Sequence, residues 1–113
     1  MSTEQPINPE VLDTLSELVG DKFIELIEVY LSDSEIRIQK IEKAFDDGDT
    51  NTLANEAHGL KGSSRNLGAN DVASICEVLE TESRAGKLGD KVQTMASIEK
   101  TFAAVAAQLK TYL

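Results

Sequence analysis

Tryptophan is absent from this chain of 113 residues, which has only one cysteine, one histidine and two prolines. A single cysteine excludes an intramolecular disulfide and a thiolate metal cluster. Aromatic residues are only 4% of the chain, so a core has to be built mainly from Leu, Ile, Val and Ala, with three phenylalanines. A chain of this length fits one hydrophobic core, and we predict a single domain over residues 1–113.

Long apolar runs are missing as well. No stretch approaches the ~20 consecutive apolar residues of a membrane span. The first residues, MSTEQPINPE, lack the basic start and the apolar stretch of a signal peptide. We therefore expect the cytoplasm as the compartment.

Negative charge dominates the composition, since eleven basic and twenty acidic residues give a net charge of −9. Such a surface repels the phosphates of nucleic acids and anionic lipid headgroups, so neither nucleic acid nor a membrane is an expected partner. Two interpretations of the acidity remain open. It serves solubility, or it complements a partner with a basic contact surface.

Turn and capping signals divide the chain into helices. Residues 1–7 are predicted to form a flexible tail, and Asn8 followed by Pro9 has the pattern of an N-cap and a first-turn proline. Gly68 is predicted to end a helix, and Asn70 is predicted to cap the next one. The predicted helices cover about 9–18, 21–46, 51–67, 71–85 and 90–112.

Apolar residues recur at spacings of three and four in each predicted helix, which is typical of amphipathic helices. The short first helix carries Val11, Leu12, Leu15 and Leu18. The third carries Leu53, Ala57, Leu60, Ser64 and Leu67 on one stripe, and the last repeats Val92, Met95, Ile98, Phe102, Val105, Leu109 and Tyr112. The pattern predicts an all-α fold: an antiparallel up-down four-helix bundle with a short additional N-terminal helix across one end.

His58 is the only histidine, and it lies within the third predicted helix. On a helical wheel at about 100° per residue, its side chain is displaced from the apolar stripe to the flank of the helix. Lys61 and Arg65, three and seven residues further on, share its face. The imidazole is therefore predicted to be exposed beside positive charge.

Two glycines stand next to the histidine, Gly59 directly after it and Gly62 one turn further on. Glycine inside a helix costs about 1 kcal/mol relative to alanine, so the pair calls for a physical reason. One interpretation is clearance that lets a second molecule reach the ring. The other is close helix packing through glycine.

A lone exposed histidine with a lysine one turn away suits few kinds of chemistry. A metal site needs more ligands. A hydrolase with a histidine base needs a nucleophile and a pocket, and Ser63 and Ser64 are not on the histidine's face. Nucleophilic catalysis by the imidazole itself remains. A phosphoryl group on His58 would add negative charge, which Lys61 can offset.

The segment His58-Gly59-Leu60-Lys61-Gly62-Ser63-Ser64, followed by Leu67-Gly68, resembles the signature of histidine-containing phosphotransfer (HPt) domains. The order and length of the predicted helices match that family over essentially the whole chain. The resemblance implies that His58 accepts a phosphoryl group from a receiver-domain aspartate and passes it to another receiver. It also implies that Lys61 steadies the phosphate and that Gly62 leaves room for it. The implied partners are receiver domains of hybrid sensor kinases and response regulators.

The fourth predicted helix adds Glu80 and Arg84, which approach His58 if this helix packs antiparallel to the third. HPt domains often have glutamine where Glu80 stands, holding the other ring nitrogen, so glutamate is a departure. Two interpretations stay open. Glu80 accepts the Nδ1–H bond and leaves Nε2 as the nucleophile, or it is a solvated acidic residue. In the first case it also repels the phosphoryl group, and Lys61 with Arg84 offsets this repulsion.

The remaining candidates carry less weight. Arg65 is either a contact for phosphate or partner, or an ordinary surface arginine. Cys76 falls on an apolar stripe and is predicted to be a buried structural thiol. Ile7, Val11, Leu12 and Leu15 are expected to cap the bundle, and any of them left exposed near the histidine would form a docking patch.

No cofactor and no metal is expected, and no nucleotide-binding glycine loop occurs in the sequence. We therefore expect a phosphocarrier without kinase activity of its own. Because the carrier face must stay open to successive partners, a monomer is expected. The alternative is a helical interaction module that docks a receiver or kinase without carrying phosphate. A small hydrolase is disfavoured for want of a cleft.

Overall fold

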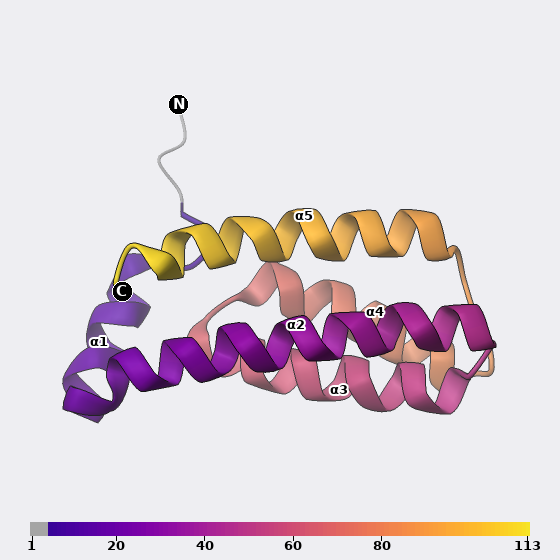
Figure 1. Cartoon of the computed structure of the whole chain (residues 1–113), viewed down its shortest axis with the longest axis horizontal. Helices are drawn as coiled ribbons and strands as arrows, with labels where there is room; N and C mark the ends of the chain where they lie inside the picture. The colour runs from indigo at the N-terminus through magenta and orange to yellow at the C-terminus, as the bar shows by residue number, and fades with distance from the viewer. Residues whose placement is uncertain (1–4) are drawn as a thin grey trace.

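Five α-helices make up most of residues 5–113, the part of the chain that the computed structural model describes (Figure 1). A 3₁₀ turn at Gly20–Lys22 joins the first helix to the second. The helices are α1 (Pro9–Val19), α2 (Phe23–Asp47), α3 (Thr50–Leu67), α4 (Asn70–Arg84) and α5 (Lys91–Lys110). Each predicted helix is present, with its ends close to the expected positions.

Local capping interactions explain most of these helix ends. Asn8 caps α1 as predicted, because its side chain accepts a hydrogen bond from the backbone N–H of Glu10. Gly68 ends α3 in the left-handed conformation that glycine adopts without strain. The prediction for Asn70 was wrong, since Ala69 is the N-cap residue of α4 and Asn70 is its first helical residue.

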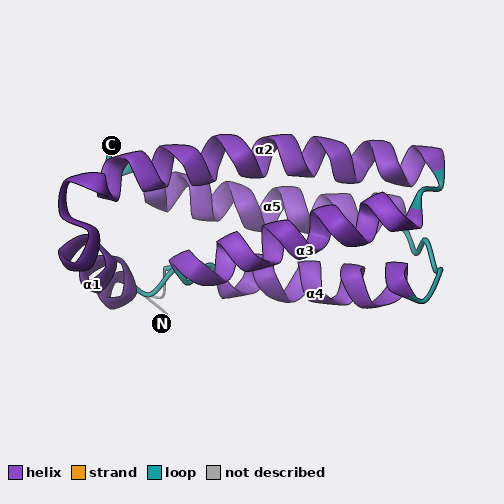
Figure 2. Ribbon diagram, turned by 90° about the horizontal axis from the view of Figure 1, so that it is seen from below, coloured by secondary structure: helices purple, strands orange, loops and turns teal. Residues whose placement is uncertain are grey.

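The four long helices lie lengthwise beside one another, and α1 lies across one end of them (Figures 1 and 2). Seen from below, α3 is in front and runs between α2 and α4 (Figure 2). It packs against both of these neighbours. The predicted four-helix bundle with a short additional N-terminal helix is therefore confirmed. None of the helices in the described range is long and apolar enough to cross a membrane.

The apolar stripes form the core, with corrections at the ends of two helices. All five stripe residues of α3 are buried. Val92 and Leu18, by contrast, are 79% and 78% exposed, and Val11 is also exposed. Val92 lies in the first turn of α5 and Leu18 in the last turn of α1. The short α1 buries Leu12 fully and only partly Leu15, because it covers one end of the bundle with a narrow face.

The end of the predicted flexible tail is in fact docked on the bundle. Ile7 is fully buried. Its backbone N–H donates to Oε1 of Gln108 at 2.8 Å, and its carbonyl accepts from Nε2 of the same side chain at 2.7 Å. Residues 1–4 lie outside the described range. Ile7 is therefore part of the core, as expected for a residue that caps the bundle, although its attachment to α5 was not predicted.

Candidate functional site

The third helix presents His58 on its α4 side. Because Leu53, Ala57 and Leu60 turn one stripe of α3 into the core, the histidine is left on the flank, with its side chain 64% exposed. Among residues 5–113 the ring makes one hydrogen bond, in which Nδ1 lies 3.0 Å from Oε2 of Glu80 on α4. The rest of the imidazole faces outward.

Glu80 is the centre of the polar cluster on this side of α3. Its side chain is only 11% exposed. Lys61 places Nζ 2.6 Å from its Oε1. Arg84, one turn further along α4, donates to Oε2 through Nε at 3.0 Å and through Nη2 at 2.8 Å. One carboxylate therefore receives a lysine, an arginine and the imidazole.

These neighbours keep Glu80 ionised. The bond from Lys61, with a further contribution from Arg84, outweighs the cost of burial and lowers the pKa of Glu80 from 4.5 to about 2. An ionised carboxylate can only accept hydrogen bonds. The proton between Glu80 and the ring must therefore be on Nδ1, and the neutral imidazole has its lone pair on Nε2.

Gly59 and Gly62 differ in how much space surrounds the position that a side chain would occupy. A Cβ atom at Gly62 would meet no atom beyond its own stretch of helix within 4 Å, which agrees with the clearance interpretation. A Cβ atom at Gly59 would overlap the guanidinium group of Arg37 from α2. At Gly59 the space is taken by the end of a flexible side chain, so neither open clearance nor close packing of helix backbones describes this position.

Arg65 lies outside the cluster around Glu80. Its Nη2 donates to Oε1 of Glu77 at 3.0 Å, and its side chain is 52% exposed. Glu77 is also 3.9 Å from Nζ of Lys61. The arginine thus forms a surface ion pair between α3 and α4. Both of its members are more exposed than Glu80, the partner of the histidine.

Arg37 on α2 is a residue of this region that the sequence analysis missed. It donates from Nε to Asp33 at 2.9 Å and from Nη1 to Glu56 of α3 at 3.1 Å. The spacing of four between Asp33 and Arg37 indicated a helix pair. Nothing in the sequence indicated that the guanidinium group of Arg37 would lie against Gly59 of α3.

A buried hydrogen bond and a buried thiol lie on the core side of the site. The hydroxyl groups of Tyr30 and Ser64 are 2.8 Å apart, which ties α2 to α3 on the core side. Cys76 of α4 is fully buried, and burial raises the pKa of its thiol to about 12. The thiol is therefore not an available nucleophile, in agreement with the predicted structural role.

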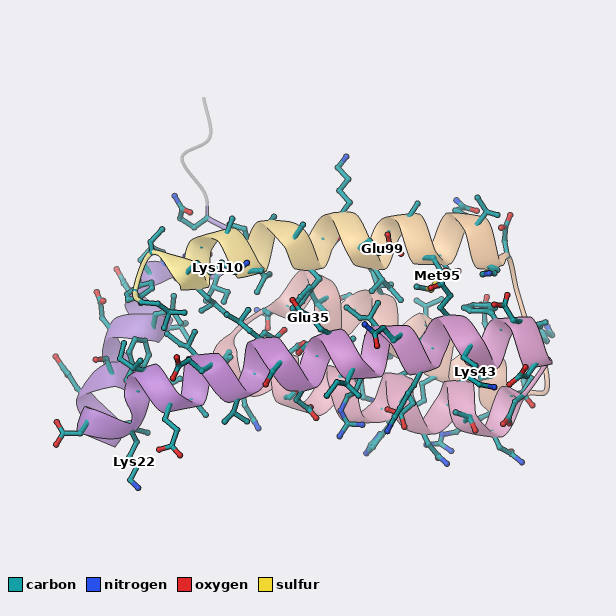
Figure 3. The ribbon with its side chains drawn as sticks, viewed as in Figure 1. Lys22, Glu35, Lys43, Met95, Glu99 and Lys110 are labelled. Atoms are coloured by element: carbon teal, nitrogen blue, oxygen red, sulfur yellow. The ribbon has the colours of Figure 1, made fainter. Side chains whose placement is uncertain are left out.

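The groove between α2 and α5, of about 520 Å³, contains none of the predicted site residues. Glu35 and Glu99 mark its walls, and Lys110 lies at one end of it (Figure 3). In residues 5–113 no three His, Cys, Asp or Glu side chains gather in a way that could hold a metal ion. The predicted site residues lie instead on α3 and α4.

Comparison with known proteins agrees with this geometry. A family model described as Hpt domain matches residues 25–110, which include His58 and all of its polar partners. The chain belongs to the Hpt domain family. The match begins inside α2, so α1 and the docked Ile7 lie outside it.

Solved and characterised Hpt proteins are similar over nearly the whole chain. The crystal structure of histidine-containing phosphotransfer protein B (HptB) from Pseudomonas aeruginosa PAO1 superposes with a TM-score of 0.90 and 32% identity, covering 98% of this chain and 96% of that chain. Histidine-containing phosphotransfer protein 4 of Arabidopsis thaliana is 29% identical over 104 residues, 89% of this chain and 82% of its own length. As an Hpt domain, this chain is a phosphorelay intermediate.

Proposed function

We propose that Nε2 of His58 is the atom that carries the phosphoryl group. Its lone pair attacks the phosphorus of a receiver's aspartyl phosphate, so that a P–N bond forms while the P–O bond to the aspartate breaks. The freed carboxylate stays on the receiver. Transfer to the next receiver runs the same exchange in the opposite direction. The observation that carries this proposal is the bond from Nδ1 to Glu80, which leaves Nε2 as the free nitrogen of an exposed ring.

Glu80 is a positioning residue in this proposal. By accepting the Nδ1–H bond it holds the ring plane and the tautomer during transfer. Glutamine at this position keeps an oxygen that can accept the same bond, whereas alanine does not. We expect Glu80→Ala to slow phosphoryl transfer about tenfold or more and Glu80→Gln to restore most of the rate. A transfer rate that is unchanged in Glu80→Ala would remove the positioning role.

Lys61 and Arg84 offset the negative charge at the site. The phosphoryl group adds about two negative charges close to the ionised Glu80. Two cations already contact that carboxylate. They are therefore placed to form hydrogen bonds with the phosphoryl group as well. Gly62 leaves the space into which the phosphoryl group fits. Arg65 lies further out, where it serves as a contact for the partner beside Glu77.

Labelling experiments test the proposal directly. Wild-type protein incubated with a receiver domain that is phosphorylated on its aspartate should acquire an acid-labile, base-stable label. His58→Ala should acquire none, while Lys43→Ala, a substitution on the exposed surface of α2, should be labelled like wild type. Label that persists in His58→Ala would contradict the proposal, as would binding of the receiver without any label on the wild-type protein.

The protein acts as a phosphocarrier and does not phosphorylate itself from ATP. Its partners are receiver domains of hybrid sensor kinases and response regulators, which also supply any metal ion that the transfer needs. Nucleic acid and membranes do not take part, because the net charge of −9 repels both. The protein works as a monomer in the cytoplasm. Incubation with ATP alone, followed by the same label analysis, should leave the protein unlabelled.

A further inference from the structure

The three arginines of the chain, Arg37, Arg65 and Arg84, all lie on or beside α3, the helix that carries His58, although the chain as a whole is strongly acidic. Arg84 bonds to the glutamate that holds the ring. Arg65 follows on the same helix as the histidine. Arg37 comes from α2 and crosses α3 at Gly59, the residue next to His58. Only Arg37 approaches the histidine from the α2 side, and the mechanism above leaves it unused.

Arg37 is held in place with part of its donor capacity free. Nε and Nη1 bond to Asp33 and Glu56. Across residues 5–113, no acceptor is hydrogen-bonded to Nη2. Its side chain is about a third exposed. An arginine fixed through Nε and Nη1 can offer its Nη2 donors to a carboxylate or a phosphate without further ordering.

An anionic group of a binding partner can also replace Asp33 at Arg37. Asp33 is nearly half exposed and pairs with Arg37 at a spacing of four on the helix surface. Such exposed pairs contribute little to stability, so an anionic partner can replace Asp33 at small cost. Val29 and Ile36, which are exposed on the same helix, fall on the side of the wheel where Asp33 lies. Apolar residues beside an arginine are typical of protein–protein contacts.

We propose that Arg37 is a docking residue that binds the anionic phosphoacceptor region of a receiver domain from the α2 side of His58. Gly59 is the residue that makes room for it. The partner chemistry follows from the reaction, because a phosphorylated receiver presents an aspartyl phosphate at the surface that meets His58. This inference rests on the proposed function. It adds a specific contact on a helix that the phosphoryl-transfer chemistry itself does not use.

Single-turnover transfer from a phosphorylated receiver separates docking from chemistry. Arg37→Ala should raise the half-saturating receiver concentration about tenfold at low salt and leave the limiting rate within about twofold. The increase should shrink as salt is added. Lys43→Ala is the matched control, because Lys43 also forms an i,i+4 pair with an aspartate, Asp47, at the C-terminal end of α2 (Figure 3). It should titrate like wild type.

Gly59→Ala provides an independent test in a protein that folds. The added methyl group displaces only the flexible end of Arg37, and alanine favours a helix more than glycine does. The variant should therefore be at least as stable as wild type and yet lose docking like Arg37→Ala. In the double variant the second substitution should add nothing further.

Three results would overturn the docking role. They are an unchanged half-saturating concentration in Arg37→Ala, a loss confined to the limiting rate, and independent effects of the two substitutions in the double variant. Failure of the docking role is distinguishable from failure of the proposed function. If only Arg37 is misassigned, wild type and Arg37→Ala both acquire label on His58 at the same receiver concentrations. If His58 is not the carrier, wild type acquires no label on it at any concentration.

Discussion

The two sides of α3 use charge in opposite ways. On the α4 side, two cations and the imidazole converge on one mostly buried carboxylate, Glu80. On the α2 side, two carboxylates converge on one partly exposed arginine, Arg37. A buried carboxylate must keep its partners to remain ionised, whereas an exposed arginine can exchange them. The comparison assigns orientation of the ring to the first side and contact with the partner to the second.

Removing one carboxylate from each side should have very different effects on stability. Glu80→Ala leaves the mostly buried Lys61 with only the more distant Glu77, 3.9 Å from its Nζ, so we expect the free energy of unfolding to fall by about 2–3 kcal/mol. Asp33→Ala removes one exposed bond from Arg37 and should cost less than about 0.5 kcal/mol. Urea denaturation of both variants at neutral pH measures the difference. Equal losses would contradict the distinction between the two sides.

The ionisation of Glu80 should also make stability depend on pH. Its pKa is lowered from 4.5 in the unfolded chain to about 2 in the folded protein. The stabilisation is therefore fully present above pH 4.5 and is lost progressively as pH falls toward 2. Glu80→Gln lacks this contribution.

Urea denaturation across that pH range should show the stability advantage of wild type over Glu80→Gln shrinking on acidification. A gap between wild type and Glu80→Gln that does not change between neutral pH and pH 2.5 would show that Glu80 is not held ionised by its neighbours.

Gly62 should separate stability from transfer. A methyl group at this position meets open space, so Gly62→Ala should raise the free energy of unfolding by up to about 1 kcal/mol through helix propensity. The same group occupies room intended for the phosphoryl group. Transfer to His58 should therefore fall about tenfold or more. Thermal denaturation together with single-turnover transfer checks both directions, and a variant that is more stable and fully active would contradict the clearance interpretation.

The smallest effect is expected at Arg65. Its bond to Glu77 joins two side chains that are both about half exposed, so Arg65→Ala should change the free energy of unfolding by less than about 0.5 kcal/mol. The half-saturating receiver concentration should rise no more than about threefold, because a rim charge acts mainly on the rate of encounter. An effect on transfer as large as that of Arg37→Ala would place Arg65 inside the docking contact.

The sequence predicted most of the fold because the determining signals are local. Asn8 with Pro9, and Gly68 after Leu67, mark helix ends through interactions a few residues apart. The position of His58 on the flank of its helix follows from the spacing of the apolar stripe alone. Local signals were less reliable at α4, where Ala69 and not Asn70 occupies the cap position.

Contacts between helices were harder to predict, because they depend on register and depth. The approach of Glu80 to His58 could be expected from antiparallel packing, although how deeply the carboxylate is buried could not. The bonds between Ile7 and Gln108 join residues 101 positions apart. The crossing of Arg37 over Gly59 depends on how α2 and α3 align. The spacing of apolar residues within a single helix specifies neither the register between two helices nor the depth at which a side chain is buried.

The most direct test of this account is to identify which ring nitrogen of His58 carries phosphorus. The bond from Nδ1 to Glu80 predicts that the phosphorylated protein contains His58 modified at Nε2. Multidimensional NMR that correlates phosphorus with the imidazole protons distinguishes the two isomers. Phosphorus on Nε2 in wild type, and none in His58→Ala, is the predicted result. Phosphorus on Nδ1 would contradict the proposed role of Glu80, and phosphorus on another residue would contradict the account of the site itself.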